Sequence, residues 1–272
     1  FSGDDTSRGG GGSDALYGGA GADTFVVSAV SDSNLSAYDG IGDFTPGSDK
    51  LDLSALVSAG QTNLAVARLG GSTFVYFGTP GEANYAGLVI ATGAVQAADL
   101  ILGQNLGMVF YGSGDADELR GGAGADTFLG GDGADLIVGG NGADSLFGGA
   151  GADVFDYNTA NHSTTTAWDT IQDFQVGIDK IDLRGVASEV TLTSFGGATF
   201  VNYGANGQII VAGVTLTQAD VLVTGESAPD LDVKDHGLTL PPLGDDDPLI
   251  LPQGYEGKAE AVIDDLDPLI LP

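Results

Sequence analysis

The stretch from Gly112 to Asp156 repeats with a strict period of nine residues, and this period limits most strongly what the chain can fold into. It reads as five consecutive nonapeptides: GSGDADELR, GGAGADTFL, GGDGADLIV, GGNGADSLF and GGAGADVFD. The sixth residue of every unit is aspartate, and the eighth is apolar: Leu119, Phe128, Ile137, Leu146 and Phe155. A disordered glycine-rich linker would not keep an apolar residue in register. The pattern therefore predicts a folded repeat.

The glycines at the first, second and fourth positions predict how each unit folds. Glycine adopts positive φ without strain, so we expect a six-residue turn and then a three-residue strand whose middle residue points inward. Two units then form one coil of a parallel β-helix, and each aspartate faces the one two repeats later. The expected pairs are Asp117 with Asp135, Asp126 with Asp144, and Asp135 with Asp153. Facing carboxylates and turn carbonyls supply the roughly six to eight oxygens that Ca²⁺ prefers, so we predict calcium sites there.

Residues 1–26 contain a less regular version of the same array. The units GGGGSDALY and GGAGADTFV place Asp14 and Asp23 at the sixth position. The preceding FSGDDTSR fits the register through Gly3 and Asp5 but has no apolar eighth residue. The pair Asp5 and Asp23 predicts one further calcium site.

The segment that follows each array is also repeated. DGIGDFTPGSDKLDLSAL, residues 39–56, matches DTIQDFQVGIDKIDLRGV, residues 169–186, and GGSTFVYFG, residues 70–78, matches GGATFVNYG, residues 196–204. The chain is therefore a tandem duplication of one module, an array followed by a cap. A cap is expected to bury the open end of the coil, which would otherwise promote aggregation.

The second cap shows the signals of antiparallel strands. Residues 190–195 and 198–203 alternate apolar and polar side chains on either side of Gly196 and Gly197, which predicts a hairpin with a two-residue turn. Asn206 and Gly207 predict another turn, before a strand over residues 208–211.

The nonapeptides resemble the GGxGxDxUx repeat of the RTX (repeat-in-toxin) family of secreted calcium-binding β-roll proteins. The cap segment D-x-I-x-D-F…G-x-D-K-I-D-L is similar to the C-terminal domain of serralysin-type (M10) metalloproteases. These resemblances imply an all-β fold of two tandem parallel β-roll modules, each capped by an antiparallel β-sandwich-like segment, with an extended acidic C-terminal tail. The expected boundaries are 1–27 for the first array, 28–106 for its cap, 107–157 for the second array, 158–224 for its cap and 225–272 for the tail.

The serralysin resemblance also implies calcium ligands where each array meets its cap. These are Asp39 and Asp43 in the first copy and Asp169 and Asp173 in the second. The alternative is that the four are surface aspartates that fix turns.

The composition narrows the classes of partner. The chain has 38 acidic and 8 basic residues, with a formal net charge of -30, so nucleic acid and anionic membranes would repel it and multivalent cations are its natural counter-ions. It has no cysteine, which excludes a disulfide framework, and no apolar run of about twenty residues that would predict a transmembrane segment. Because the first residue is Phe1 and the one methionine is Met108, we expect a chain processed or truncated at its N-terminus.

The sequence shows no catalytic motif. It contains no HExxH zinc motif, no GxSxG nucleophile elbow and no Walker loop. His162 and His236 have no partner at metal-ligand spacing. We therefore expect a protein that is not an enzyme.

The acidic tail contains two nearly identical octapeptides, DDDPLILP at Asp245–Pro252 and DLDPLILP at Asp265–Pro272. Each places three aliphatic residues between prolines, which predicts an extended peptide too short to form a core. Three interpretations remain: a linear motif that docks on a partner or a second copy, part of a type I export signal, or a disordered tail with no partner.

Together these patterns favour a secreted, non-catalytic calcium-binding module of a Gram-negative bacterium. Its Ca²⁺-dependent folding would support export by the type I secretion apparatus and then surface-layer or matrix assembly or adhesion. The alternative is the C-terminal secretion and folding domain of a secreted hydrolase, such as a serralysin-like metalloprotease, whose catalytic domain is not in this chain.

Overall fold

The computed structural model describes residues 2–80 and 85–225, and both tail octapeptides lie outside this part. Nearly all regular structure in it is strand. The exceptions are the short helix α1 (Ser54–Ser58) and the 3-10 helices η1 (Ala97–Asp99) and η2 (Gln218–Asp220). The all-β fold with largely parallel sheets confirms the fold class predicted from the sequence. Helix α1 was not predicted, and it forms where Leu56 and Val57 are buried against the core.

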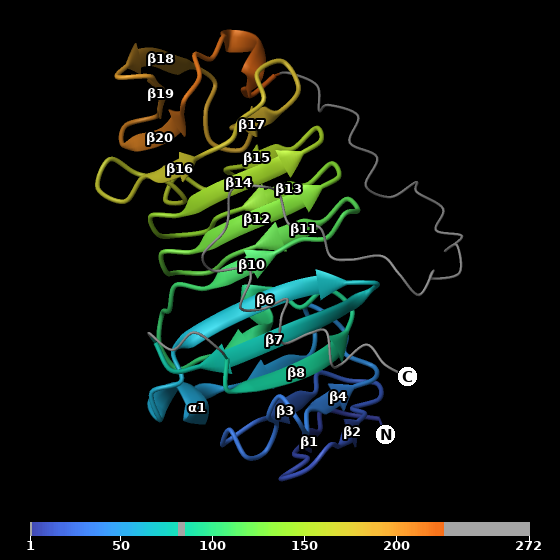
Figure 1. The fold of residues 1–272 in the computed structure, drawn as a ribbon. Coiled ribbons are helices and arrows are strands. Elements are labelled where there is room, and N and C mark those ends of the chain that lie inside the picture. Colours follow the sequence, from blue (N-terminus) through green and yellow to red (C-terminus); the bar gives the residue numbers. More distant parts are fainter. Residues whose placement is uncertain (1, 81–84, 226–272) are drawn as a thin grey trace.

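The second array forms a parallel β-helix with two repeats in each coil (Figure 1). One face consists of β11 (Glu118–Arg120), β13 (Leu136–Val138) and β15 (Val154–Asp156), and the other contains β12 (Thr127–Asp132) and β14 (Ser145–Ala150). Strands on one face pair in parallel, with Leu119 opposite Ile137 and Phe128 opposite Leu146. The first face has the predicted three-residue strands. β12 and β14 have six residues because their pairing continues into the next turn, where Gly131 lies opposite Gly149.

The eighth residues of the repeats fill the centre of the coil, as predicted. Leu119 is 2% exposed, and Phe128, Ile137, Leu146 and Phe155 are fully buried. The rings of Phe110 and Phe128 stack, with centroids 4.8 Å apart and planes 5° from parallel. Each such side chain contributes roughly 1.5–3 kcal/mol by leaving water. The core thus holds the turns, with their aspartates, at a fixed spacing.

The first array has the same architecture with shorter strands. β1 (Thr6–Ser7) pairs with β3 (Thr24–Val26), which pairs with β5 (Lys50–Asp52). On the other face, β2 (Ala15–Leu16) pairs with β4 (Asp39–Ile41). β4 and β5 belong to the sequence of the cap, so the coil continues past the last nonapeptide.

Each cap contributes three antiparallel strands. In the second cap these are β18 (Val190–Phe195), β19 (Ala198–Tyr203) and β20 (Gly207–Ala212), and in the first they are β6 (Asn63–Leu69), β7 (Ser72–Gly78) and β8 (Gly87–Thr92). Gly196 and Gly197 have φ of 63° and 84°, as a type I′ hairpin turn requires, which confirms the predicted hairpin. The second turn begins earlier than predicted, because Gly207 is already paired with Tyr203.

The first cap lies in the middle of the molecule and joins the two arrays. In the twelve-stranded sheet the order is β18-β19-β20-β16-β14-β12-β10-β6-β7-β8-β4-β2 (Figure 1). β8 pairs with β4 of the first coil, and β6 pairs in parallel with β10 (Val109–Tyr111), which begins the second. β16 (Asp169–Ile171) connects the second array to its own cap. The first cap, which was expected to close one end of one coil, therefore pairs with an end of both coils.

The opposite face is divided into two sheets. A four-stranded sheet has the order β1-β3-β5-β9, and a five-stranded sheet has the order β11-β13-β15-β17-β21. β9 comprises Leu100–Ile101, β17 comprises Lys180–Asp182 and β21 comprises Val221–Leu222. The two arrays are thus joined by strand pairing on one face only.

Candidate metal sites

The turns of the second array stack so that their aspartates form rows. In each row the backbone N–H of one aspartate donates to Oδ1 of the aspartate one coil later. The N···O distance is 2.8 Å from Asp117 to Asp135, 2.8 Å from Asp126 to Asp144, and 2.9 Å from Asp135 to Asp153. The structure thus brings together each of the three aspartate pairs proposed from the repeat.

Both rows continue into the second cap. The N–H of Asp144 donates to Oδ1 of Asp169 at 3.0 Å, and the N–H of Asp153 donates to Oδ1 of Asp179 at 3.1 Å. Sequence reasoning placed Asp169 at this junction but missed Asp179, which lies 26 residues after Asp153, whereas the earlier steps are 18. The one sequence signal for Asp179 was that it occurs at the same place as Asp49 in the two copies of the duplicated segment.

The first array has two shorter rows of the same kind. The N–H of Asp5 donates to Oδ1 of Asp23 at 2.8 Å, and that of Asp23 to Oδ1 of Asp49 at 3.0 Å. On the other side the N–H of Asp14 donates to Oδ1 of Asp39 at 3.0 Å. Asp14 and Asp49 were not among the predicted ligands, although the nine-residue register already marked Asp14.

Asp43 and Asp173 do not lie in the rows. The two oxygens of Asp43 accept the N–H groups of Gly18 and Gly19 at 3.0 and 2.8 Å. Those of Asp173 accept the N–H groups of Gly148 and Gly149 at 2.9 and 3.0 Å. These contacts fix the last glycine turn of each array against its cap, which is the turn-fixing role that the sequence left as the alternative.

Several row aspartates have a buried Oδ2 atom with no hydrogen-bond partner in the described part of the chain. A buried polar atom without a partner is unfavourable by roughly 1–3 kcal/mol, more if it is charged, so such atoms are rare in folded proteins. They belong to Asp5, Asp14, Asp23, Asp135, Asp144, Asp153 and Asp169. Because most of these atoms recur at the sixth position of the repeat, we infer that the repeat itself requires them.

In several repeats the first glycine allows this unpartnered oxygen to approach the backbone closely, because glycine has no β-carbon. These glycines are Gly9, Gly18, Gly130, Gly139 and Gly148. A β-carbon on Gly139 would lie 2.5 Å from Oδ2 of Asp144, too close for any real contact. A β-carbon on Gly130 would meet both Oδ2 of Asp135 and the carbonyl O of Gly148, one coil later. Carboxylate and carbonyl oxygens, the ligands that Ca²⁺ prefers, therefore gather at this glycine.

Carboxylates alone do not complete a ligand set. In residues 2–80 and 85–225, no three His, Asp or Glu side chains come together in a geometry that would hold a metal. A cation between two row aspartates would therefore take its remaining ligands from turn carbonyls and water, as Ca²⁺ readily does.

Burial makes ionisation of the rows unfavourable. It raises the pKa of Asp135 and Asp169 to about 8, and the pKa of Asp144 and Asp153 to about 7. It also raises the pKa of Asp39, Asp126, Asp173 and Asp179. A cation between the carboxylates would reverse this effect, because an opposite charge nearby favours the ionised form.

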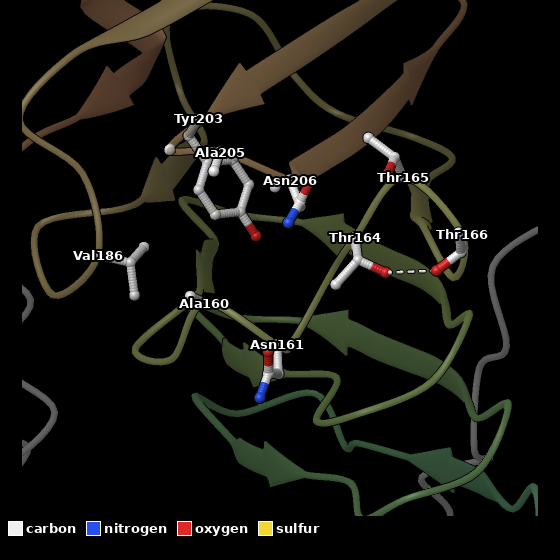
Figure 2. A pocket seen from close by; sticks show the side chains of 11 residues that line it. Ala160, Asn161, Thr164, Thr165, Thr166, Val186, Tyr203, Ala205 and Asn206 are labelled. Carbon is white, nitrogen blue, oxygen red and sulfur yellow. Dashed lines mark hydrogen bonds between the residues drawn. The ribbon is translucent and has the colours of Figure 1, made fainter.

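A separate hollow of about 430 Å³ lies in the second cap (Figure 2). Its lining includes Thr164, Thr166, Asn161, Asn206 and Tyr203, and it contains no carboxylate. It therefore offers no charged ligand to a hard cation.

A coil of two nonapeptides, with glycine turns and rows of buried aspartates, defines a β-roll of the RTX type. The family described as "Peptidase M10 serralysin C terminal" matches residues 5–106 and again residues 118–238, and the chain belongs to it. The two matched regions correspond to the two copies of the duplicated module. The match is to a C-terminal domain, not to a catalytic one.

Three solved structures are similar to parts of the chain. The AlgE6R2 and AlgE6R3 subunits of the Azotobacter vinelandii mannuronan C5-epimerase are 23% and 26% identical. They cover 43% and 51% of this chain and 91% and 94% of their own, with TM-scores of 0.33 and 0.32. The extracellular lipase LipA from Serratia marcescens is 19% identical over 81% of this chain and 38% of its own, with a TM-score of 0.31. Scores this low add nothing to the assignment. No curated protein matches the chain. In the described part, no helix is both long and apolar enough to span a membrane.

Proposed function

We propose that this chain is a non-catalytic calcium-binding module of a secreted protein, in which Ca²⁺ binding between the aspartate rows drives folding. The observation that carries the proposal is the set of buried Oδ2 atoms without partners, most of which lie directly against the first glycine of their repeat. The formal charge of -30 also favours cation binding, because close carboxylates repel one another unless cations lie between them.

The proposed ligands are the aspartates of the rows, together with the junction aspartates implied by the family. From the sequence these are Asp5, Asp23, Asp117, Asp126, Asp135, Asp144, Asp153, Asp39, Asp43, Asp169 and Asp173, and the geometry adds Asp14, Asp49 and Asp179. Four members are the weakest, because protein donors already occupy both of their oxygens: Asp43, Asp117, Asp126 and Asp173. We propose the same boundaries as from the sequence, with two arrays, two caps and a tail from residue 225.

The energy scale makes calcium a plausible folding switch. A site with a dissociation constant of about 0.1 mM gains roughly 1.4 kcal/mol at about 1 mM free Ca²⁺. Four such sites would add several kcal/mol, which is comparable to the net stability of a domain. The same contribution vanishes at the sub-micromolar Ca²⁺ of a cytosol. The arrays would then stay unfolded for export by a type I secretion apparatus and would fold outside the cell, with the cap as nucleus.

After export, the folded module would serve in surface-layer or matrix assembly or in adhesion, with the octapeptides of the tail as contact segments. The duplicated cap supports this role, because one cap is enough for a secretion domain. The family match supports the alternative, the C-terminal secretion and folding domain of a secreted hydrolase. Sequencing the intact gene distinguishes the two, since several hundred upstream residues with a zinc-binding helix would favour the hydrolase.

Circular dichroism during a calcium titration tests the central claim. The strand signal should be weak in chelator and should grow with Ca²⁺ in the range of about 0.1–1 mM. Mg²⁺ serves as the control and should substitute poorly, because it requires a compact octahedral site. An unchanged strand signal in chelator would show that folding does not depend on the metal.

A further inference from the structure

The seam between the first cap and the second array is built differently on its two faces. On one face β6 and β10 pair in parallel, with Val66 opposite Phe110, and the sheet is continuous. On the other face one sheet ends at β9 and the next begins at β11. β11 is therefore an edge strand, and its outward N–H and C=O groups need partners that no strand supplies.

The side chain of Gln96, just before η1, supplies those partners. Its Nε2 donates to the carbonyl O of Glu118 at 2.7 Å, and its Oε1 accepts the N–H of Arg120 at 2.8 Å. Glu118 and Arg120 are the two ends of β11. One side-chain amide thus makes the pair of hydrogen bonds that a residue of a neighbouring parallel strand would make.

Arg68, in β6, brings a positive charge to the same place. Its Nη1 donates to the carbonyl O of Glu118 at 2.7 Å, and its Nε lies 3.2 Å from Oδ1 of Asp117. The other oxygen of Asp117 accepts the N–H and the hydroxyl of Ser113 at 2.6 and 2.9 Å. Protein donors therefore occupy both oxygens of the first aspartate in this row, whereas Oδ2 of Asp135, the next one, has no partner.

We propose that Arg68 stands at the head of this row in place of a metal ion, so that the seam forms without calcium and Asp117 binds none. A guanidinium is always ionised and offers several donors in a fixed geometry, so it can satisfy a carboxylate and a carbonyl together. The contact is largely shielded from water, with the Asp117 side chain 7% exposed. The inference rests on the proposed function, because it assigns protein donors to the first aspartate of the row and Ca²⁺ to the aspartates that follow it.

The second copy of the module provides an internal comparison. When the two hairpins are aligned on their Gly-Gly turns, Ser194 takes the place of Arg68, and when η1 is aligned with η2, Thr217 takes the place of Gln96. The second cap is followed in the sequence by the acidic tail, not by another nonapeptide array. Arginine and glutamine thus occur in the copy that has to hold a further array.

Calcium stoichiometry of the whole chain tests the role of Asp117. Isothermal titration calorimetry with CaCl₂ should give the same number of bound ions for Asp117→Asn as for the unmodified chain. The matched variant Asp153→Asn, in the same row, should bind at least one ion fewer. If Asp117→Asn loses as many ions as Asp153→Asn, Asp117 coordinates metal and the proposal is wrong.

Amide hydrogen exchange in chelator tests the seam itself. The N–H of Arg120 donates to Oε1 of Gln96, and it should remain protected from exchange without calcium. In the variant Arg68→Met it should lose that protection. Arg184→Met removes an arginine whose partner, Asp182, lies outside the rows, and it should leave the protection unchanged. Free exchange of the Arg120 amide in the unmodified chain would overturn the proposal. The two failures can be told apart. Free exchange of this amide in chelator, with a strand signal that still grows with Ca²⁺, refutes the seam alone, whereas a strand signal unchanged in chelator refutes the calcium function.

Discussion

Replacing Gly139 by alanine tests whether the space beside the row carboxylates is a metal site. Gly139 is the first residue of its nonapeptide, and an added β-carbon would lie 2.5 Å from Oδ2 and 3.2 Å from Cγ of Asp144. Its φ lies outside the left-handed region, so alanine introduces no backbone strain there. The substitution therefore acts through volume alone, by displacing the Asp144 carboxylate that is proposed to bind the ion.

The expected loss of stability has three parts. Moving the Asp144 carboxylate in a packed coil costs about 1–3 kcal/mol. Loss of one site with a dissociation constant of about 0.1 mM removes a further ~1.4 kcal/mol at about 1 mM Ca²⁺. Alanine also restricts the unfolded chain, which offsets about 0.4–1 kcal/mol. The free energy of unfolding in calcium should thus fall by about 1.4–4 kcal/mol.

Urea unfolding followed by circular dichroism in 1 mM Ca²⁺, together with calorimetric calcium counting, measures both effects. Gly114→Ala is the matched control, because nothing lies within 4 Å of its β-carbon and its φ is also outside the left-handed region. The control should keep the full calcium stoichiometry. If Gly139→Ala binds as many ions as the control and unfolds at the same urea concentration, the space holds no metal.

Three further outcomes are expected. Burial raises the pKa of Asp135 and Asp169 to about 8 and that of Asp144 and Asp153 to about 7, from about 3.9 in the unfolded chain. The stabilising effect of their protonation is fully present below about pH 4 and is lost as the pH rises through 7 to 8. The calcium-free chain should therefore show more strand by circular dichroism at pH 5 than at pH 8.5, and a flat profile would contradict this. Phe155→Ala, at a fully buried position, should destabilise the chain to urea by about 3–5 kcal/mol, whereas Phe195→Ala, at a position 79% exposed, should change the stability by less than about 0.5 kcal/mol. Similar losses for both would refute the assignment of the core. Truncation after Gly225 should leave the calcium titration intact and abolish self-association in analytical ultracentrifugation; association that survives would exclude the octapeptides as contact segments.

Local patterns in the sequence were enough for the strands and core of the second array and for the hairpin of the second cap. The nine-residue period placed Phe128 and Leu146 inside the coil because inward direction depends only on position within a repeat. The Gly196-Gly197 turn fixed the hairpin to the residue, since such a turn determines the register of the strands that it joins.

Contacts between distant segments were not predictable. The period could not reach Asp49 and Asp179, because the spacing changes from 18 to 26 residues where the array enters the cap. The position of the first cap between the arrays depends on the pairing of β6 with β10. Which strand edge pairs with which is decided by contacts between distant segments, and no local sequence pattern indicates it. Nothing in the sequence distinguished Arg68 from other charged residues, because its contact with Asp117 joins segments that are far apart in the chain.

The placement of the first cap in the long sheet has a consequence for how such molecules grow. β18 is the counterpart of β6, and it ends the twelve-stranded sheet in the described residues. The outer edge that β6 offers to the next coil therefore recurs at the far end, ready for the same parallel partner. Gene duplication can lengthen a rod of this kind one unit at a time, because each added unit pairs with an existing strand edge. At the far end only the side-chain contacts would have to be added, since Ser194 and Thr217 stand where the first cap has Arg68 and Gln96.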